Sequence, residues 1–352
     1  MIARLIAAVF GLILSAAPSP SIATSFSPYP DDSLDGPASP VQIRLRSIQV
    51  QLFRDDGDQL PDGNAIGGGS GTGRSSVLLR RAELGVTGGL TPRARYLVVA
   101  DLAASPVLRD AFIELGAGPQ FQVRAGQLRL PFGIETQLPP HRLPAINRML
   151  MTFLAEQPDE IPGFLQEWDR GIEVLGEPIS GPLNLSYAFA VVNGTGPNAP
   201  DSNDAKDLVG RVGLRLAGLQ VGTSWYRGRA PDSAGFDRAR NRAGWDLEFS
   251  PNPLKALLIR GELIHGHDET AANRGWYLLA SYTIRDRWTP LVRIERWDPD
   301  LDTGADTITR TTLGLTLAAW DIAAFSLNYE YRRDAAHPGV GNLALAQAQI
   351  SF

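Results

Sequence analysis

The chain has 352 residues, a formal net charge of -5, 43% hydrophobic residues and no cysteine. The lack of cysteine leaves no residue for a disulfide framework or a lipid-modified amino-terminal thiol. The acidic balance, without a basic stripe interleaved with aromatic residues, gives no support for binding to nucleic acid.

The first forty residues carry a targeting signal and a tail. Arg4 precedes an apolar run over residues 5–17, and small side chains follow at Ser21 and Ala23, so residues 1–23 are predicted to be a secretory signal peptide cut after Ala23. The apolar run is shorter than the roughly 20 residues that a spanning helix needs. Residues 24–40 are rich in Ser, Pro and Asp without periodicity, which predicts a flexible tail.

From residue 41 to residue 352 the sequence repeats one pattern. Segments of about ten residues alternate apolar and polar side chains and are separated by Gly, Pro, Asn and Asp. The predicted strands are 41–53, 76–88, 94–103, 108–116, 120–130, 169–177, 183–193, 207–217, 219–227, 241–250, 256–266, 274–285, 288–297, 306–318, 321–333 and 343–352. Connections after the even-numbered strands are short, and most of the others are long. This sorting is typical of a transmembrane, antiparallel, up-and-down β-barrel of about 16 strands, with turns in the periplasm and loops outside.

The two faces of the segments support a membrane barrel. Apolar residues alternate along the strand at 183–193 and would meet lipid, and tryptophans near segment ends, such as Trp225, Trp276 and Trp320, suit the level of lipid headgroups. Periodicity alone does not say which face is inside, so a secreted all-β binding domain is the alternative. The export signal, the sorted loops and the aromatic ends favour integration in the outer membrane of a Gram-negative bacterium, with the outer-membrane lipid as a partner.

One long connection interrupts the strand pattern. The alternation of residues 121–130 stops at Pro131, because proline donates no hydrogen bond to a β-ladder, and no strand is predicted before residue 169. Connections this long are uncommon in compact proteins unless they serve a function. Residues 131–168 form the third long loop, which we expect to fold into the lumen and constrict it.

Several stretches resemble the phosphate-selective porin O and P family. They are GQLRLPFGIE at 126–135, RRAELGVTGGL at 80–90, LRDAFIEL at 108–115, DRGIEVLGE at 169–177, and the terminal Phe352. The resemblance runs from about residue 41 to the end. It implies a sixteen-stranded, anion-preferring diffusion pore, a homotrimer, an inward-folded third loop, and recognition of Phe352 by the barrel assembly machinery.

Basic side chains on the face opposite the apolar one are the candidate pore lining. They are Arg81, Arg95, Arg124, Arg211, Arg215, Arg260, Arg293, Arg310 and Arg332. Arginine can present a forked donor to phosphate or carboxylate oxygens. The same face carries a similar number of acids, namely Glu83, Asp101, Asp110, Glu114, Glu173, Asp246, Glu248, Glu262, Glu295 and Glu330. These charges could therefore select anions or only pair across strands.

The third long loop adds its own charges to the candidate constriction. Arg129 at its root and His141, Arg142 and Arg148 along it oppose Glu135, Glu156, Asp159 and Glu160. Lysine occurs only at Lys206 and Lys255, whereas phosphate-specific members of the family use lysines and arginines near the constriction. The predicted function is passive diffusion of small hydrophilic solutes, above all anions, with phosphate or polyphosphate possible. A general or cation-tolerant porin is the alternative.

Signals for an enzyme are poor, and we expect no enzymatic activity, no cofactor and no metal. His265 and His267 share one strand face without the further ligands of a closed metal site. A phospholipase-like barrel enzyme would need Ser224 or Ser281 to pair with His265, and the spacing does not favour this. The glycine run at 67–73 lacks the lysine of a phosphate-binding loop.

Overall fold

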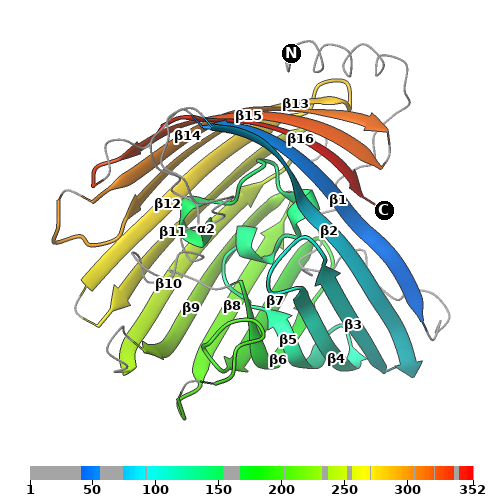
Figure 1. Ribbon diagram of the computed structural model, residues 1–352. Coiled ribbons are helices and arrows are strands. Elements are labelled where there is room, and N and C mark those ends of the chain that lie inside the picture. The colour runs from blue at the N-terminus through cyan, green and yellow to red at the C-terminus, as the bar shows by residue number, and fades with distance from the viewer. Residues whose placement is uncertain are drawn as a thin grey trace.

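The computed structural model describes residues 41–55, 74–91, 93–153, 167–201, 203–231, 237–251, 256–269, 271–304, 306–320, 322–336 and 341–351. Sixteen strands within these residues form a closed antiparallel barrel, in which sequence neighbours pair and β1 pairs with β16 (Figure 1). The predicted fold class is therefore confirmed. The signal peptide, the tail, most of the first long loop, residues 154–166 with their three acids, Lys255 and Phe352 lie outside the described residues.

The observed strands match the predicted ones in number and order. They are β1 (Gln42–Asp55), β2 (Arg74–Thr91), β3 (Ala94–Asp101), β4 (Leu108–Gly118), β5 (Phe121–Arg129), β6 (Trp168–Ile179), β7 (Leu183–Val192), β8 (Asp207–Leu216), β9 (Leu219–Pro231), β10 (Asp237–Phe249), β11 (Leu257–Asp268), β12 (Ala271–Tyr282), β13 (Trp288–Asp298), β14 (Ile308–Trp320), β15 (Ala323–Asp334) and β16 (Leu343–Ser351). The ends differ by a few residues. The largest differences are at β9 and β10, which extend into the predicted loop between them and shorten it.

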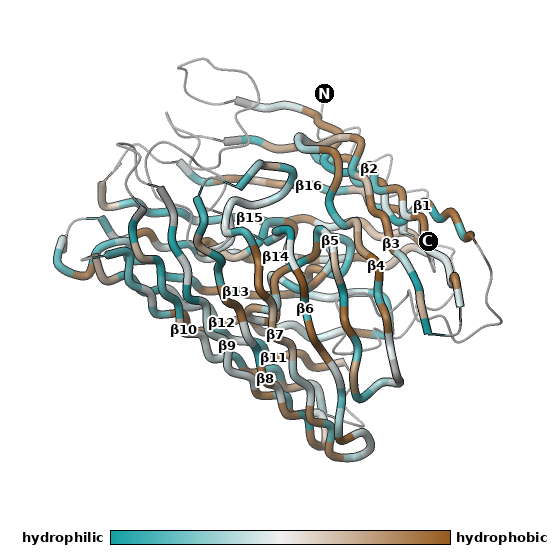
Figure 2. Tube along the Cα trace, turned by 90° about the horizontal axis from the view of Figure 1, so that it is seen from below, coloured by the Kyte–Doolittle hydropathy of each residue, from teal (hydrophilic) through white to brown (hydrophobic). Residues whose placement is uncertain are grey.

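Alternation along each strand separates an outer from an inner face. Figure 2 shows hydrophobic and hydrophilic residues alternating along the strands. Large apolar side chains such as Val191, Leu278 and Leu313 are exposed on the outer face. Charged side chains such as Arg211 and Glu330 are buried on the inner face. The chain is thus inverted relative to a soluble barrel, because its exposed surface is apolar and its interior is charged.

The connection between β5 and β6 leaves the wall and lies inside the barrel (Figure 1). It contains two short 3-10 helices, η2 (Glu135–Gln137) and η3 (Pro140–Arg142), and one turn of α-helix, α2 (Leu150–Phe153). At its root the Leu130 N–H donates to the Glu167 carbonyl at 2.8 Å. We call residues 130–153 the inner segment. No helix within the described residues is both long and apolar enough to cross a bilayer.

Candidate functional site

Hydrogen bonds tie the inner segment to strands far away in the sequence. The Gly133 N–H donates to the Ser224 hydroxyl of β9 at 3.0 Å, and the Leu150 N–H donates to the Glu295 carboxylate of β13 at 2.9 Å. On the opposite wall, Gln349 of β16 donates to the His141 carbonyl at 2.9 Å. The segment therefore crosses the interior from one side of the wall to the other, and wall side chains satisfy its backbone groups as buried backbone requires.

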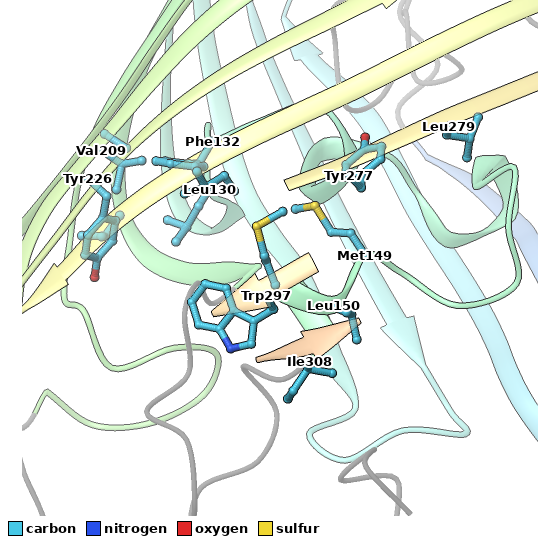
Figure 3. Close-up of a cluster of buried hydrophobic side chains, with 14 residues drawn as sticks. Leu130, Phe132, Met149, Leu150, Val209, Tyr226, Tyr277, Leu279, Trp297 and Ile308 are labelled. Carbon is cyan, nitrogen blue, oxygen red and sulfur yellow. The ribbon is translucent and has the colours of Figure 1, made fainter. Parts of the chain in front are cut away.

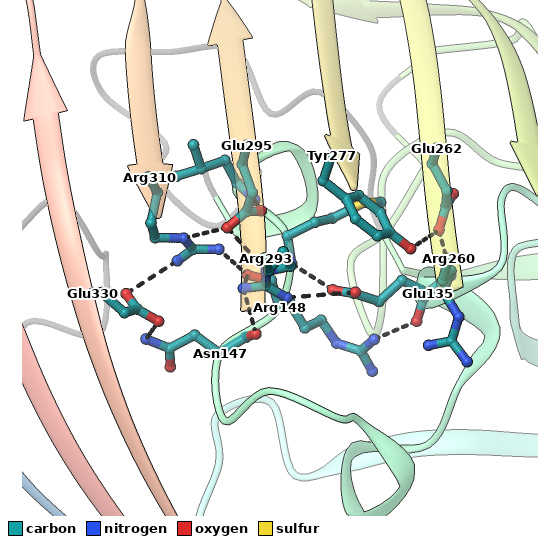
Figure 4. A network of polar contacts seen from close by, with 12 residues as sticks. Glu135, Asn147, Arg148, Arg260, Glu262, Tyr277, Arg293, Glu295, Arg310 and Glu330 are labelled. Atoms are coloured by element: carbon teal, nitrogen blue, oxygen red, sulfur yellow. Dashed lines mark hydrogen bonds and ion pairs between the residues drawn. The ribbon is translucent and has the colours of Figure 1, made fainter. Parts of the chain in front are cut away.

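The centre of this contact is a network of alternating charges (Figure 4). Arg293 lies between Glu295, at 3.0 Å, and Glu135 of the inner segment, at 3.5 Å. Arg310 joins Glu295, at 2.6 Å, to Glu330, at 3.4 Å. All five side chains are almost fully buried. Buried charges are tolerated when they are paired in this way, so the five side chains hold one another and are not presented to a passing solute.

The same network also forms hydrogen bonds with the backbone of the inner segment. The Arg293 guanidinium donates to the Asn147 carbonyl at 2.9 Å, and Arg310 donates to the Arg148 carbonyl. Asn147 in turn donates to the Glu330 carboxylate at 3.1 Å. Charge-assisted hydrogen bonds of this kind are about twice as strong as neutral ones. Residues 147 and 148 are consequently fixed to strands β13, β14 and β15.

Two of the predicted constriction arginines meet one carboxylate at the root of the segment. Arg129 lies 3.1 Å from Glu167, and Arg148 forms an ion pair with the same side chain. Arg129 also stacks over the Trp168 ring, 4.1 Å from its centroid. Burial lowers the pKa of Arg148, Glu167 and Glu135 raise it, and the charge of Arg129 lowers it further. The ordinary pKa of arginine lies far above neutral pH, so Arg148 stays charged. Its ion pair with Glu167 therefore stabilises the conformation of the inner segment.

An apolar cluster inside the barrel supports the other side of the inner segment (Figure 3). Its members are all buried: Leu130, Phe132, Met149, Leu150 and Met151 of the segment, and Ala190, Val192, Val209, Tyr226, Ile264, Tyr277, Leu279, Trp297 and Ile308 of the wall. The prediction of a polar inner face is therefore wrong for part of the wall between β7 and β14. The physical reason is that the segment covers these positions and excludes water from them.

The remaining predicted pore arginines lie on the inner face, mostly beside acids. Arg124 pairs with Glu114 at 2.7 Å and with Glu173 at 3.3 Å. Arg211 pairs with Asp246, and Arg260 with Glu248 at 2.7 Å. Arg215 donates to the Gln220 amide oxygen at 2.8 Å, and Arg332 to the Gly341 carbonyl at 2.7 Å. Cross-strand pairing, the alternative left open by the sequence, is thus what most of these side chains do.

The exposure of the partners differs on the wall formed by β2, β3 and β4. In the pair Arg95 and Glu114, the arginine side chain is 27% exposed and the glutamate 4%. In the pair Arg81 and Asp101, the values are 12% and 0%. The basic member of each pair therefore reaches water while the acid lies behind it. At the long-loop end of β10 and β11 the acid is the more exposed partner, because the Asp268 side chain is 21% exposed and that of its partner Arg242 is not exposed.

His141 and Arg142 occupy the last turn of η3, and both are half-buried. The His141 Nδ1 lies 3.9 Å from the Glu83 carboxylate of β2. His141 therefore places a basic group of the inner segment next to β2, the strand that carries Arg81. Arg95 lies farther along the same wall, because it pairs in register with Gly89, eight residues from Arg81 on β2. Arg81, Arg95, His141 and Arg142 are all partly exposed, but they do not form one cluster.

The arrangement needed for a barrel hydrolase is not present at the residues considered. Ser224 and Ser281 are buried on the inner face, whereas His265 alternates with inward-facing Ile264 and lies on the outer face. The barrel wall separates the hydroxyls from the imidazole, so they do not form a catalytic pair. Within the described residues, no group of three or more His, Asp or Glu side chains is arranged to hold a metal ion.

Sequence reasoning missed several residues that position the inner segment. Glu167 pairs with both root arginines, and hydrogen bonds of Ser224, Asn147 and Gln349 join the segment to the wall. Tyr277 acts indirectly, because it donates to Glu262, which accepts from the Glu135 N–H of the segment. Periodicity is the signal that could have found two of them, because Ser224 and Tyr277 alternate with the outward-facing Trp225 and Trp276. Asn147 and Glu167 lie in irregular segments, where the sequence has no period that predicts a direction.

No family model matches the sequence, and no curated protein is significantly similar to it. Solved porin structures do share its fold. An anion-selective porin from Comamonas acidovorans is 13% identical with a TM-score of 0.63, over 90% of this chain and 100% of that one. OmpF of Salmonella typhi, in complex with daunomycin, is 10% identical with a TM-score of 0.64, over 89% and 97%. The channel DcaP of Acinetobacter baumannii is 11% identical with a TM-score of 0.62, over 91% and 100%.

Proposed function

We propose that the chain is an outer-membrane porin that lets small hydrophilic solutes diffuse passively through its barrel. The observation that carries the proposal is the inverted barrel: a closed sixteen-stranded wall with apolar side chains exposed outside and charged ones inside. A closed barrel leaves no strand edge unpaired, so it can cross a bilayer without exposing backbone groups to lipid. The shared fold of the solved porins supports the same function.

The inner segment is the proposed constriction. It is held by the charged network and the apolar cluster on the β7 to β15 side, so the aqueous path is proposed to run between the segment and the wall of β1 to β4. Arg81, Arg95, His141 and Arg142 border this path. The other predicted pore arginines serve instead to fix the segment and the wall.

A preference for anions is the second part of the proposal. A narrow path with low-dielectric walls focuses the field of the charges that line it. On the β2 to β4 wall the exposed member of each pair is the arginine, so a passing ion meets guanidinium groups before carboxylates. Asp268 opposes this at the outer mouth. The acids behind the arginines favour a weak preference over a specific site, and a general or cation-tolerant porin is the competing function.

The finer predictions from the sequence remain proposals. Phosphate or polyphosphate specificity rests on the resemblance to the phosphate-selective porins, and a scarcity of lysine weakens it. A homotrimer rests on the same resemblance; the solved relatives include a trimer form of OmpT from Vibrio cholerae. Recognition of Phe352 by the assembly machinery also stays a prediction.

The test of the channel is conductance across a planar bilayer. The purified mature chain, refolded in detergent, should insert and give discrete current steps, and vesicles containing it should swell in solutions of small sugars. A protein that enters lipid but passes neither ions nor sugars would refute the channel. The reversal potential under a salt gradient then gives the sign of the ion preference, and added phosphate that blocks the chloride current would indicate a specific anion site.

A further inference from the structure

The outer face carries a basic cluster near the long-loop end of strands β9 to β12. In register across these strands lie Arg227, Asn241, His267 and Ala272, and in the next row Trp225, Ala243, His265 and Arg274. Arg227, His267 and Arg274 are exposed. The rings of His265 and His267 are 5.5 Å apart. Neither Arg227 nor Arg274 has a carboxylate partner within the part of the chain that the structure describes.

Aromatic side chains lie directly below this cluster. Trp245 of β10 and Trp276 of β12 flank Leu263 in one register row, two residues farther from the loops than His265 and Arg274. Two residues along a strand span about 7 Å. Both tryptophans are exposed on the outer face, with Leu278 beyond them. Tryptophan in such a position lies at the boundary of hydrocarbon and headgroup, which places the basic cluster at headgroup level.

Small side chains separate the basic residues. On β10 the outward positions above Trp245 are Ala243, Asn241 and Ala239, between arginines on β9 and histidines on β11. Strands two apart in a sheet are separated by roughly 10 Å. A tetrahedral anion resting over β10 would therefore be within reach of guanidinium groups from one side and imidazoles from the other.

We propose that this cluster, defined by Arg227, His265, His267 and Arg274, binds the phosphorylated headgroup of a lipid in the outer leaflet. The proposal rests on the membrane location given under the proposed function. A lipid fits better than free phosphate because the tryptophans and leucines below the cluster supply an apolar surface continuous with it for acyl chains. Charge complementarity provides the attraction to the headgroup, since basic side chains near a membrane surface attract anionic lipids.

The acids near the cluster have partners of their own. Asp298, which pairs in register with Arg274, accepts a hydrogen bond from Arg296 at 3.2 Å. Glu269, in the turn that follows β11, forms an ion pair with Arg238. The cluster therefore keeps a net positive charge toward the lipid.

Native mass spectrometry of the detergent-purified barrel tests the proposal, with diphosphorylated and monophosphorylated lipid A as probes. We expect the wild type to retain the diphosphorylated form more strongly. The double variant Arg227→Gln with Arg274→Gln should weaken this retention by up to about 25-fold, the product of roughly fivefold for each basic residue near a membrane surface. The matched control, Arg54→Gln with Arg333→Gln, removes the same charge from the outer face of β1 and β15 and should bind as the wild type does.

Three results would overturn the inference. They are equal retention of both lipids by the wild type, equal loss in the two double variants, and displacement of the lipid by inorganic phosphate, which would indicate a phosphate site. The wild-type comparison decides the matter even if the double variant fails to fold. A barrel that conducts but shows no lipid preference refutes this inference alone, whereas one that retains lipid but does not conduct refutes the proposed channel.

Discussion

The backbone N–H of Glu135 donates to the side-chain carboxylate of Glu262 at 2.7 Å, which joins the inner segment to strand β11 across the barrel. Tyr277 donates to the same oxygen at 2.9 Å. Glu262 is buried, so this acceptor is not replaced by water. The bond from Glu135 fixes the first turn of the segment to the wall, and the bond from Tyr277 holds the accepting carboxylate in place.

Replacing Glu262 with alanine should loosen the segment. The change leaves the Glu135 N–H and the Tyr277 hydroxyl without their acceptor, at a cost of about 1–3 kcal/mol for each buried group left unsatisfied. Single-channel recordings should show a larger or noisier conductance than the wild type. Glu262→Gln retains an acceptor oxygen and should conduct as the wild type does. A conductance of Glu262→Ala that equals that of the wild type would show that the segment does not depend on this bond.

A methyl group at Gly275 should push the helical turn of the segment away from the wall. A Cβ there would overlap the side chain of Met151 and come within 2.8 Å of the Trp297 ring. Overpacking of this kind costs about 1–3 kcal/mol. Gly275→Ala should therefore lower the temperature at which the barrel unfolds, measured by circular dichroism.

Two further variants control for a general effect of alanine in a strand. At Gly261 of β11 the nearest atom to a new Cβ is the Tyr277 carbonyl oxygen at 3.2 Å, so Gly261→Ala should cost less. Met151→Ala in the Gly275→Ala background should restore part of the lost stability, because it removes the overlapping atoms. If both alanine variants unfold at the same temperature, the proposed contact with Met151 is not what limits this position.

Periodicity was sufficient to predict the wall from the sequence. Each strand buries one face, so a polar residue such as Arg211 or Glu330 is assigned its side by counting from its apolar neighbours. All sixteen strands follow from this count. Their ends do not, since β9 and β10 continue pairing into residues that read as a loop, where ladder hydrogen bonds outweigh local turn preference.

The interior could be predicted only in part. Counting placed Arg293, Glu295 and Arg310 inside, but which of them pair depends on how the strands are staggered and on Glu135, which arrives from an irregular segment. The apolar cluster around Met149 and Met151 was missed for the same reason. Val209 and Trp297 lie on the inner face of the barrel, where the alternating pattern predicts polar residues, and only the segment that covers them explains their burial.

Arg293 should be among the most sensitive positions of the wall. Replacing it with methionine leaves the buried carboxylates of Glu135 and Glu295 short of a partner, and breaking a buried ion pair from one side costs about 3–5 kcal/mol. The folded barrel should melt at a lower temperature in a gel-shift assay with heating. Arg296→Met is the matched control on the same strand, because Arg296 is exposed on the outer face and surface pairs contribute about 0–1 kcal/mol. Similar melting of the two variants would contradict a role for Arg293 in stabilising the interior.

Ion preference should depend on the exposed arginines rather than on the buried ones. Arg95 and Arg142 border the proposed path, and a unit charge about 8 Å from a passing ion in water changes its energy by about 0.5 kcal/mol, a roughly twofold effect on permeability. Arg95→Gln with Arg142→Gln should therefore lower the chloride permeability about fourfold and raise the potassium permeability about fourfold, which shifts their ratio about sixteenfold toward potassium. Reversal potentials under a salt gradient measure this ratio, and the shift should shrink at high salt because screening shortens the reach of each charge.

The control, Arg54→Gln with Arg333→Gln, removes the same charge from the outer face and should leave the ratio unchanged. A double variant that keeps the wild-type ratio, or a wild type that prefers potassium, would show that the path does not run along the wall of β2 to β4.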